Sequence, residues 1–253
     1  MTFPPEHILT AFHAEASTQS RQLGAAWDNG VLVGDVVYAM AGPWASWSAK
    51  LREKLKVHGA RVVRPVVASD GRYTAAGWKA NQYVPGGLRG RVDEAAQLAL
   101  RIDAVLADVP VPGNRDDVFA RAERAAWEET GEAIVALPAD VPVQVGHADV
   151  LGTTLFAAAN PPTIVDVVPT AAPRPAGWSA ALVIVDGLIA GVVDDAVCRR
   201  FNHVPHMDQL LLRAVAYRRH VNNLHPASKS NVRSEIERVE EMLVSRASEI
   251  LAE

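Results

Sequence analysis

The chain has little of several features that define common protein classes. It carries one cysteine among 253 residues, Cys198, which excludes an intramolecular disulfide and a zinc site built from several thiolates. It has no long run of lysine and arginine, and its formal net charge is −4, so we expect no nucleic-acid partner. It also has no Gly-x-Ser-x-Gly segment, which removes one common signature of a serine hydrolase.

Long hydrophobic segments are missing too. The most apolar stretch, residues 178–193, is shorter than the roughly 20 residues that a membrane-spanning helix needs. Asp186 lies at its centre, where a carboxylate is costly in lipid. The first residues lack the basic region and apolar stretch of a signal peptide. We therefore expect a buried helix, no membrane partner and a cytoplasmic location.

What is present is the composition of a globular protein, with 49% hydrophobic and 21% charged residues. The first third favours strands and one helix. Its expected elements are a turn at 28–30, a strand over 31–38, a helix over 44–57 with Trp44, Trp47, Leu51 and Leu55 at helical spacing, and strands over 61–68 and 73–83. Pro85-Gly86-Gly87 then interrupts the pattern, which places a boundary between residues 1–84 and 85–253.

The part beyond this boundary is expected to be mainly helical. Apolar periodicity predicts helices over residues 93–106, 115–129, 178–193, 207–221 and 232–251. The C-terminal helices offer apolar faces, so a homodimer, or a purely structural dimeric scaffold, is one hypothesis for the protein. A sheet-rich first part followed by a helical second part predicts an α+β protein with two lobes.

A pair of aspartates stands out in the second part. A strand is expected at 143–147 and delivers Asp149 into a loop, and strands at 153–157 and 163–168 with a turn between them form a hairpin that carries Asp166. The hairpin is expected to bring Asp166 back beside Asp149. Two carboxylates held together on short rigid elements can bind a divalent cation and orient a hydroxyl nucleophile, which is the geometry of phosphoryl transfer.

The order of several motifs resembles the aminoglycoside-phosphotransferase and choline-kinase-like superfamily, and within it an uncharacterised actinobacterial group. The motifs are Gly146-His147-Ala148-Asp149, Leu155-Phe156, Ile164-Val165-Asp166, Arg174-Pro175 and Val183-Ile184-Val185-Asp186. The resemblance implies a protein-kinase-like bilobal fold, with a small N-terminal lobe around an antiparallel sheet and a larger helical C-terminal lobe. It also implies transfer of the γ-phosphate of ATP or GTP to a hydroxyl of a small metabolite.

The resemblance assigns a role to each motif aspartate. Asp149 matches the catalytic aspartate that orients the substrate hydroxyl, and Asp166 matches the aspartate that holds Mg²⁺ against the nucleotide phosphates. Thr153 stands where such enzymes have an asparagine as second metal ligand. Read without the resemblance, Asp149 would cap nearby backbone amides and Asp166 would be a solvated residue at a strand end.

Two further residues are expected to support the site rather than to react. His147 matches a histidine that packs beneath the catalytic loop. Asp186, buried in mid-helix, needs hydrogen-bond donors, because a buried carboxylate without partners is costly. The resemblance suggests the backbone amides of the loop around His147 and Asp149 as donors. An ion pair is the alternative, with Arg174, Arg199 or Arg213 as partner.

The chain also departs from the family pattern. The third strand should present a cation to the α- and β-phosphates, but its positions hold Tyr38, Ala39 and Met40, which leaves Glu53 on the next helix without its usual partner. No Gly-rich phosphate loop is visible. These departures favour an alternative function, a catalytically impaired kinase-like module that binds a nucleotide, a metabolite or a protein. Asp194, Asp195 and Asp208 would suit a cationic acceptor but are equally consistent with solvated helix ends.

Overall fold

The structure, a computed structural model, describes residues 3–14, 19–113, 115–158, 160–228 and 230–252. The chain divides into two compact units, Met1–Arg89 with Val150–Val168 and Gly90–Asp149 with Pro169–Glu253. The expected hairpin therefore belongs to the first unit, while Asp149 ends a segment of the second. Within the described ranges no helix is long and apolar enough to cross a membrane.

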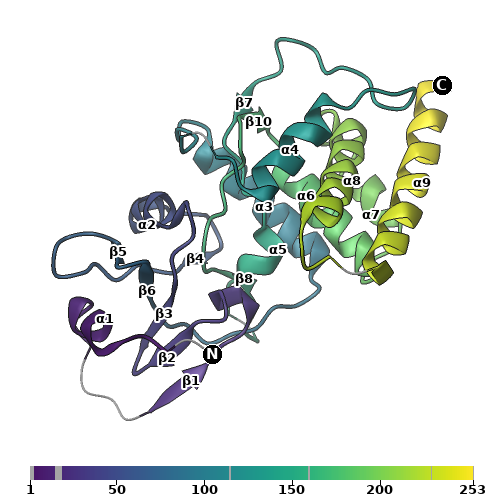
Figure 1. Cartoon of the computed structure of the whole chain (residues 1–253). Helices are drawn as coiled ribbons and strands as arrows, with labels where there is room; N and C mark the ends of the chain where they lie inside the picture. The colour runs from purple at the N-terminus through teal and green to yellow at the C-terminus, as the bar shows by residue number, and fades with distance from the viewer. Residues whose placement is uncertain (1–2, 15–18, 114, 159, 229, 253) are drawn as a thin grey trace. The chain divides into compact units, whose positions relative to one another are not determined.

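The first unit is built on an antiparallel sheet (Figure 1). The sheet has the strand order β1-β2-β3-β6-β5, and β8 and β9 form a separate hairpin to which β4 adds a parallel strand. The elements of this unit are α1 (Glu6–Ala11), β1 (Ser20–Gln22), η1 (Ala25–Trp27), β2 (Val31–Val33), β3 (Val36–Met40), α2 (Ala45–Lys54), β4 (Arg61–Val62), β5 (Thr74–Ala75), β6 (Trp78–Gln82), α5 (Val150–Thr153), β8 (Thr154–Leu155) and β9 (Thr163–Ile164).

Two turns divide strands that the sequence predicts as continuous. The run at 31–38 folds into the β2–β3 hairpin, because Gly34 adopts φ +62° and reverses the chain after Val33. The run at 73–83 is divided in the same way, since Ala76 and Gly77 both have positive φ between β5 and β6. Alternating apolar residues predicted the strands correctly but not these reversals.

The turn at 28–30 lies where the sequence predicts it, between η1 and β2. Asp28 and Asn29 both adopt left-handed backbone conformations with φ near +52°, which Asn and Asp tolerate better than most residues. A Cβ at Gly30 would lie 2.6 Å from the carbonyl oxygen of Tyr38, so only glycine fits there. The turn thus fixes the position of the Asp28 side chain next to the sheet.

Helix α2 forms as predicted but buries a different face. Of the residues expected to face the core, Trp44, Trp47 and Leu51 are only half-buried, whereas Leu55, directly after the helix, is buried. The fully buried stripe consists instead of Ala45, Ser48, Ala49 and Arg52. A serine and an arginine on the inner face of a helix need polar partners inside the unit.

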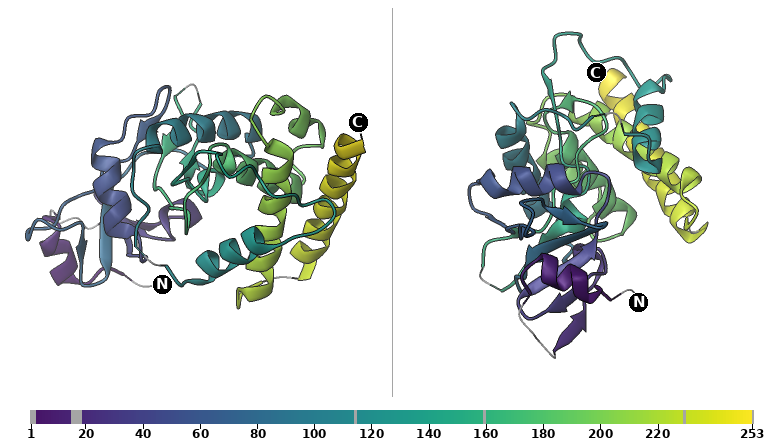
Figure 2. Two further views of the ribbon diagram at one scale, coloured as in Figure 1. Left: turned by 90° about the horizontal axis from the view of Figure 1, so that it is seen from above. Right: turned by 60° about the vertical axis from the view of Figure 1, so that its left-hand side comes forward.

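The pleat of the sheet separates two groups of side chains. On one face Tyr38, Trp78 and Ala80 pack with Ile8 of α1 and with Phe12, which follows this helix. Figure 2 shows α1 lying against the sheet. On the other face Val37 packs with Trp27 of η1 and with Leu155 and Val165 of the hairpin. Side chains of a strand alternate between faces, so Lys79 and Asn81 of β6 belong to the face of Val37, toward the hairpin. The strand geometry thus explains why a lysine of β6 meets Asp166.

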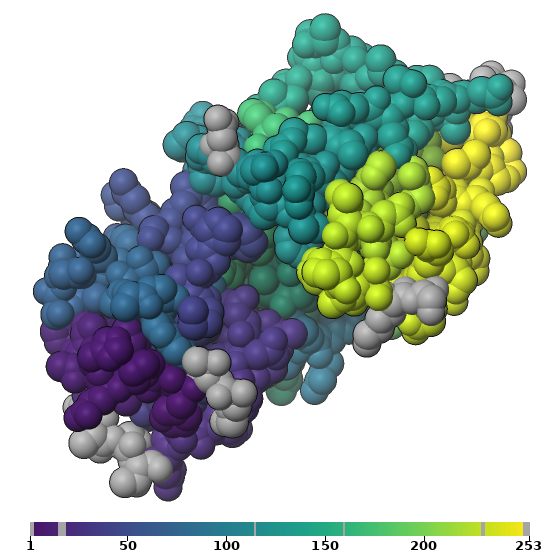
Figure 3. All heavy atoms as spheres, viewed as in Figure 1, coloured from purple at the N-terminus to yellow at the C-terminus, as the bar shows by residue number. Residues whose placement is uncertain are grey.

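The second unit is mainly helical, as expected. Its elements are α3 (Val92–Leu106), α4 (Val118–Glu128), β7 (Val143–Gln144), β10 (Arg174–Pro175), α6 (Trp178–Ile189), α7 (Ala196–Arg200), α8 (Met207–Leu224) and α9 (Ser230–Ala252). Helix α6 is buried on nearly every side and packs against α3, α8 and α9. Helix α9 lies along α8 at the surface of the unit (Figure 3).

The long C-terminal helix uses its apolar side within its own chain. Ile236, Val239, Leu243 and Ala247 recur at helical spacing and are buried in the single chain. The stripe that could have formed a dimer interface is therefore covered by the same unit. The homodimer stays a prediction.

Candidate functional site

Asp166 lies at the centre of a buried polar cluster in the first unit. Its residue exposure is 6%, and its two carboxylate oxygens are approached from different elements. The Oδ1 atom accepts hydrogen bonds from the Ser48 hydroxyl and, at 2.9 Å, from the backbone N–H of Val167. The Oδ2 atom lies 2.6 Å from Nζ of Lys79. The aspartate is thus neither a solvated strand-end residue nor an isolated charge.

The polar stripe of α2 provides one side of this cluster. Ser48 and Arg52 are one helical turn apart, and Nε of Arg52 donates to the Ser48 hydroxyl at 3.2 Å. The same Nε lies 3.5 Å from Oδ1 of Asp166. The two other guanidinium nitrogens donate at 2.9 Å to the Val63 carbonyl and to Oδ1 of Asn81. Arg52, which is 1% exposed, therefore connects α2, β6 and the segment after β9 that carries Asp166.

Lys79 provides the other side from the neighbouring strand. Its Nζ lies between two carboxylates, 2.6 Å from Asp166 and 2.8 Å from Oδ2 of Asp28. Lys79 pairs across the ladder with Ala39 of β3, so the two side chains share one face of the sheet. Ala39 is one of the positions where the sequence pattern lacks the expected cation. The structure places a cation at that face from β6 instead.

The charges in the cluster stabilise one another in their ionised forms. Burial alone raises the pKa of Asp166, but the positive charges of Lys79 and Arg52 outweigh it and hold the pKa below its usual value. For Lys79 burial lowers the pKa, but Asp166 and Asp28 outweigh it and raise the pKa above its usual value. The cluster thus contains an ionised carboxylate next to an ionised amine, both largely shielded from water.

Sequence reasoning missed Lys79, Arg52, Ser48 and Asp28. The signal for Lys79 was available, because it is the only charged residue in the strand 78–82 and follows a tryptophan. The role of Lys79 near Asp166 becomes visible only once β3 is seen to pair with β6, which lies about forty positions later in the chain. Glu53, expected to lack its partner, accepts a hydrogen bond from the Tyr73 hydroxyl at 2.7 Å. The residue next to it, Arg52, faces the cluster.

A cavity of about 300 Å³ opens in the same unit. It is lined by η1 and the residues before it, by the connector from Tyr83 to Leu88 and by Leu155 of the hairpin. Trp27 and Tyr83 form an aromatic pair with ring centroids 5.8 Å apart. Gly86 brings the connector close to the hairpin, because a Cβ there would lie 2.9 Å from that of Leu155. Asp28 directly follows the η1 residues that line this cavity.

The loop that carries Asp149 is part of the second unit. His147 is fully buried, and its Nδ1 accepts a hydrogen bond from the backbone N–H of Asp149 at 3.1 Å. The backbone N–H of His147 donates to the Ser179 hydroxyl at 2.8 Å. The ring therefore holds the backbone turn that presents Asp149. These bonds agree with the expected role of His147 in supporting the loop, and that role stays a prediction.

Beneath this loop lies a carboxylate that sequence reasoning did not single out. Asp103 of α3 accepts hydrogen bonds from the Ser179 hydroxyl at 2.5 Å and from the backbone N–H of Gly177 at 2.9 Å. Burial raises the pKa of Asp103 to about 6, because the hydrogen bonds offset only part of the cost of removing the charge from water. Ser179 connects this buried carboxylate to the backbone of His147.

This raised pKa predicts a specific pH dependence of stability. Because the folded state holds the proton of Asp103 more tightly than the unfolded chain does, this group's contribution to stability falls as the pH rises from about 4 to about 6. The total loss of unfolding free energy over this range is about 3 kcal/mol.

The variant Asp103→Asn tests this pH dependence. In Asp103→Asn the change of unfolding free energy between pH 4 and pH 7, measured by urea denaturation, should differ from the wild-type change by about that amount. Asp108→Asn, at an exposed position just after the same helix, should follow the wild-type profile, and superimposable Asp103→Asn and wild-type profiles would refute the assignment.

Asp186 has a different partner from those that the sequence suggested. Its oxygens accept two hydrogen bonds from Arg218 of α8, each at 2.6 Å. Neither the loop amides nor the three arginines considered from the sequence make these bonds. Arg218 also lies 3.5 Å from the carbonyl oxygen of Ala148. The ion pair therefore reaches the loop of Asp149 through the arginine.

The remaining residues expected at the site are placed as follows. Thr153 ends α5 and is buried, and its carbonyl accepts a hydrogen bond from the backbone N–H of Val165 at 2.8 Å. This bond connects Thr153 to the residue directly before Asp166. The hairpin is confirmed, since β8 pairs with β9. Asp149 and Asp166 belong to different units, so their expected proximity stays a prediction.

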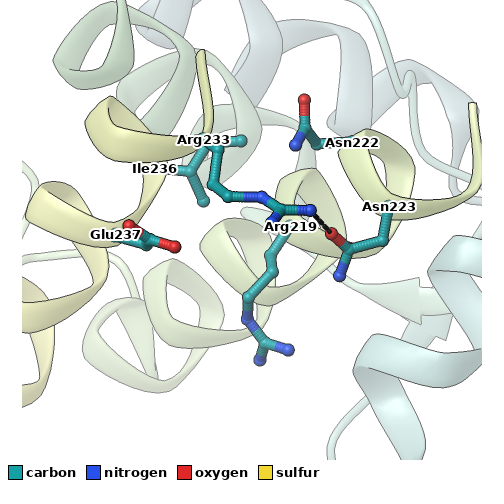
Figure 4. Close-up of a pocket in the computed structure, with 6 residues that line it drawn as sticks. All are labelled: Arg219, Asn222, Asn223, Arg233, Ile236 and Glu237. Carbon is teal, nitrogen blue, oxygen red and sulfur yellow. Dashed lines mark hydrogen bonds between the residues drawn. The ribbon is translucent and has the colours of Figure 1, made fainter. Parts of the chain in front are cut away.

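A second cavity lies in the second unit and has a different character. It has a volume of about 270 Å³ and is lined by Arg219, Asn222, Asn223, Arg233, Ile236 and Glu237 (Figure 4). Arg219 already binds the carboxylates of Glu129 and Glu240, and Arg233 donates to Asn223 at 3.4 Å. Of the aspartates considered for a cationic acceptor, Asp208 is paired with Arg246 at 3.3 Å.

No family model matches the sequence, and no curated protein does. Solved structures match in fold. An aminoglycoside phosphotransferase from Alicyclobacillus acidocaldarius is similar over 100% of this chain and 97% of its own, with a TM-score of 0.60 and 13% identity. A microcompartment-associated aminopropanol kinase is similar over 97% and 96%, with a TM-score of 0.56 and 14% identity. A choline kinase from Streptococcus pneumoniae is similar over 90% and 93%, with a TM-score of 0.53 and 12% identity.

These similarities confirm the predicted fold. The chain has the α+β protein-kinase-like fold of aminoglycoside phosphotransferases and choline kinases, with an antiparallel sheet in one unit and mainly helices in the other. The narrower resemblance to an actinobacterial group stays a prediction. At such low identity the likeness concerns the fold, so the chemistry has to be argued from this chain's own residues.

Proposed function

We propose that the protein is a small-molecule phosphotransferase that binds ATP or GTP and moves the γ-phosphate to a metabolite hydroxyl. The observation that carries the proposal is the buried pair of Lys79 and Asp166. An ammonium binds phosphate oxygens, and a carboxylate binds a divalent cation that accompanies a nucleotide. The pair would therefore supply a metal ligand and the phosphate-binding cation that the third strand lacks.

The cavity of the first unit is the proposed place for the nucleotide base. Its walls combine the aromatic rings of Trp27 and Tyr83 with Leu155, which suits a flat apolar ring system. Its volume of about 300 Å³ lies at the lower end of the range for small-molecule sites. Because Asp28 follows the η1 residues that line the cavity and binds Lys79, the phosphates of a bound nucleotide are proposed to extend toward Lys79.

Magnesium is compatible with the donors that this cluster offers. Asp166 is an ionised oxygen donor, and Mg²⁺ usually takes one or two carboxylates together with nucleotide phosphates. Asp166 would hold the ion, with Thr153 as the proposed second residue. Bound there, the ion would neutralise charge on the phosphates. Ser48 and Arg52 would keep the carboxylate of Asp166 in its orientation while Lys79 binds a phosphate oxygen.

Asp149 is proposed to orient the acceptor. Its carboxylate would accept a hydrogen bond from the substrate hydroxyl and align it for in-line attack on the γ-phosphorus. The hydrogen bond from the Asp149 backbone to His147 would keep the turn rigid during the reaction. Amino alcohols are a reasonable first class of acceptors to test, because proteins of this fold include a choline kinase and an aminopropanol kinase.

A titration with and without magnesium tests this function. We expect calorimetry to detect ATP or GTP binding by the wild type, strengthened by Mg²⁺, and a coupled assay to detect ADP or GDP with choline, ethanolamine or aminopropanol present. Asp166→Asn should lose the magnesium-dependent part of the affinity, because an amide is a poorer metal ligand than a carboxylate. Circular dichroism establishes that the variant is folded. Equal affinity of both folded proteins for the magnesium complex would count against the assignment of Asp166.

A second function is favoured by one specific observation. The oxygens of Asp166 already accept from Ser48, Val167 and Lys79, so an entering metal has to compete with an internal cation. This arrangement favours a module that binds a nucleotide without transferring phosphate. Nucleotide binding that is insensitive to magnesium, with no product from any acceptor, would support this alternative.

A further inference from the structure

The turn of Asp28 places a carboxylate where a ligand phosphate is proposed to bind. Its Oδ2 lies 2.8 Å from Nζ of Lys79, and 54% of its side-chain surface is exposed. Asp166, the other partner of Lys79, is almost completely buried. Lys79 is therefore held from inside by a fixed carboxylate and from outside by an exposed one.

The two carboxylates differ in what else holds them. Asp166 is fixed by Ser48, by a backbone amide and by the nearby Arg52. Among the described residues Asp28 forms an ion pair with Lys79, and its charge also acts on Arg52. A phosphate group carries the same sign of charge and binds an ammonium with similar geometry. The hydrogen bonds of Asp166 to Ser48 and to the Val167 backbone do not depend on Asp28, so an anion that takes the place of Asp28 at Lys79 need not break them.

We propose that Lys79, carried on β6 instead of β3, is the phosphate-binding cation of this protein, and that Asp28 competes with the nucleotide for it. The inference rests on the proposed function in one respect, the identity of the ligand as a nucleotide. In the free protein Asp28 covers the ammonium and keeps the cluster electrically balanced. In the bound protein a phosphate oxygen takes the place of the Asp28 carboxylate.

The variant Asp28→Asn separates this role from folding. Asparagine keeps the size of the side chain and tolerates the left-handed conformation with φ +52°. Because the carboxylate is half-exposed, its loss should leave the thermal midpoint nearly unchanged. The charge that repels a phosphate disappears, so the affinity for ADP and for tripolyphosphate should rise roughly tenfold at low salt. The affinity for adenosine, which carries no phosphate, should stay at the wild-type value.

Three further variants of the chain complete the experiment. Asp70→Asn removes an exposed carboxylate from another turn of the same unit and should bind ADP like the wild type. Lys79→Met should lose binding of tripolyphosphate, while Lys79→Arg should keep part of it. All affinities are measured by calorimetry without metal and at two salt concentrations. The gain in Asp28→Asn should shrink at the higher salt, since the charge is partly solvated.

The outcomes distinguish a failure of this inference from a failure of the proposed function. A rise in affinity for tripolyphosphate but none for adenosine supports competition by Asp28. Unchanged or weaker ADP binding by Asp28→Asn, with clear binding by the wild type, overturns the inference and leaves nucleotide binding intact. Tripolyphosphate binding that depends on Lys79, without any preference for a nucleotide, supports the phosphate site and contradicts the proposed function. No binding of either probe by any of the proteins overturns both.

Discussion

Asp149→Asn is expected to lower the rate of phosphoryl transfer by about two to four orders of magnitude. The amide can occupy the same space, but it cannot take the proton of the substrate hydroxyl. Nucleotide affinity should be unchanged, because the nucleotide is proposed to bind to residues of the first unit. The turn should also be unchanged, since the backbone N–H of residue 149 still donates to His147.

Steady-state kinetics with the best acceptor and calorimetry with ADP measure the two quantities separately. Asp140→Asn is the matched control, because Asp140 is an exposed residue on a turn of the same unit and should have no effect on either. A fall in nucleotide affinity equal to the fall in rate would contradict the proposed role, since it would point to a residue that binds the nucleotide. A rate within twofold of the wild type would remove Asp149 from the reaction.

The elements that could be read from the sequence are those with a local signal. The hairpin of β8 and β9 follows from two apolar runs around a turn, and α6 follows from an apolar stretch too short for a membrane. The helix α2 was also predicted, but its buried face was not. The apolar residues Trp47 and Leu51 favoured one side, while the cluster around Asp166 required Ser48 and Arg52 on the inner side.

The partners of the charged residues depend on tertiary structure, so local sequence patterns could not predict them. Lys79 meets Asp166 only because β6 pairs with β3 and the hairpin packs on the same face of the sheet. Asp186 likewise binds Arg218, thirty-two positions away on another helix. A missing cation at one strand position was therefore weak evidence for lost activity, because a neighbouring strand can supply the same charge to the same face.

Arg52 also depends on tertiary partners, and its loss should lower the stability of the first unit strongly. Arg52→Met keeps much of the volume of the side chain but removes all of its donors. Asp166 then loses part of its compensating charge, and the Val63 carbonyl and Asn81 lose partners inside the unit. Removing one member of a buried charge network typically lowers the free energy of unfolding by about 3–5 kcal/mol. Urea denaturation of the purified variant measures this loss.

Two comparisons separate the charge network from a general effect of the helix. Lys54→Met changes an exposed cation near the end of α2 and should change stability by no more than about 0.5 kcal/mol. In the double variant Arg52→Met with Asp166→Asn, the buried carboxylate is neutral, so the combined loss should be smaller than the sum of the two single losses. Additive losses would mean that Arg52 stabilises the unit without acting on Asp166. A clear coupling would instead show that charge holds α2 to the segment after β9 that carries Asp166.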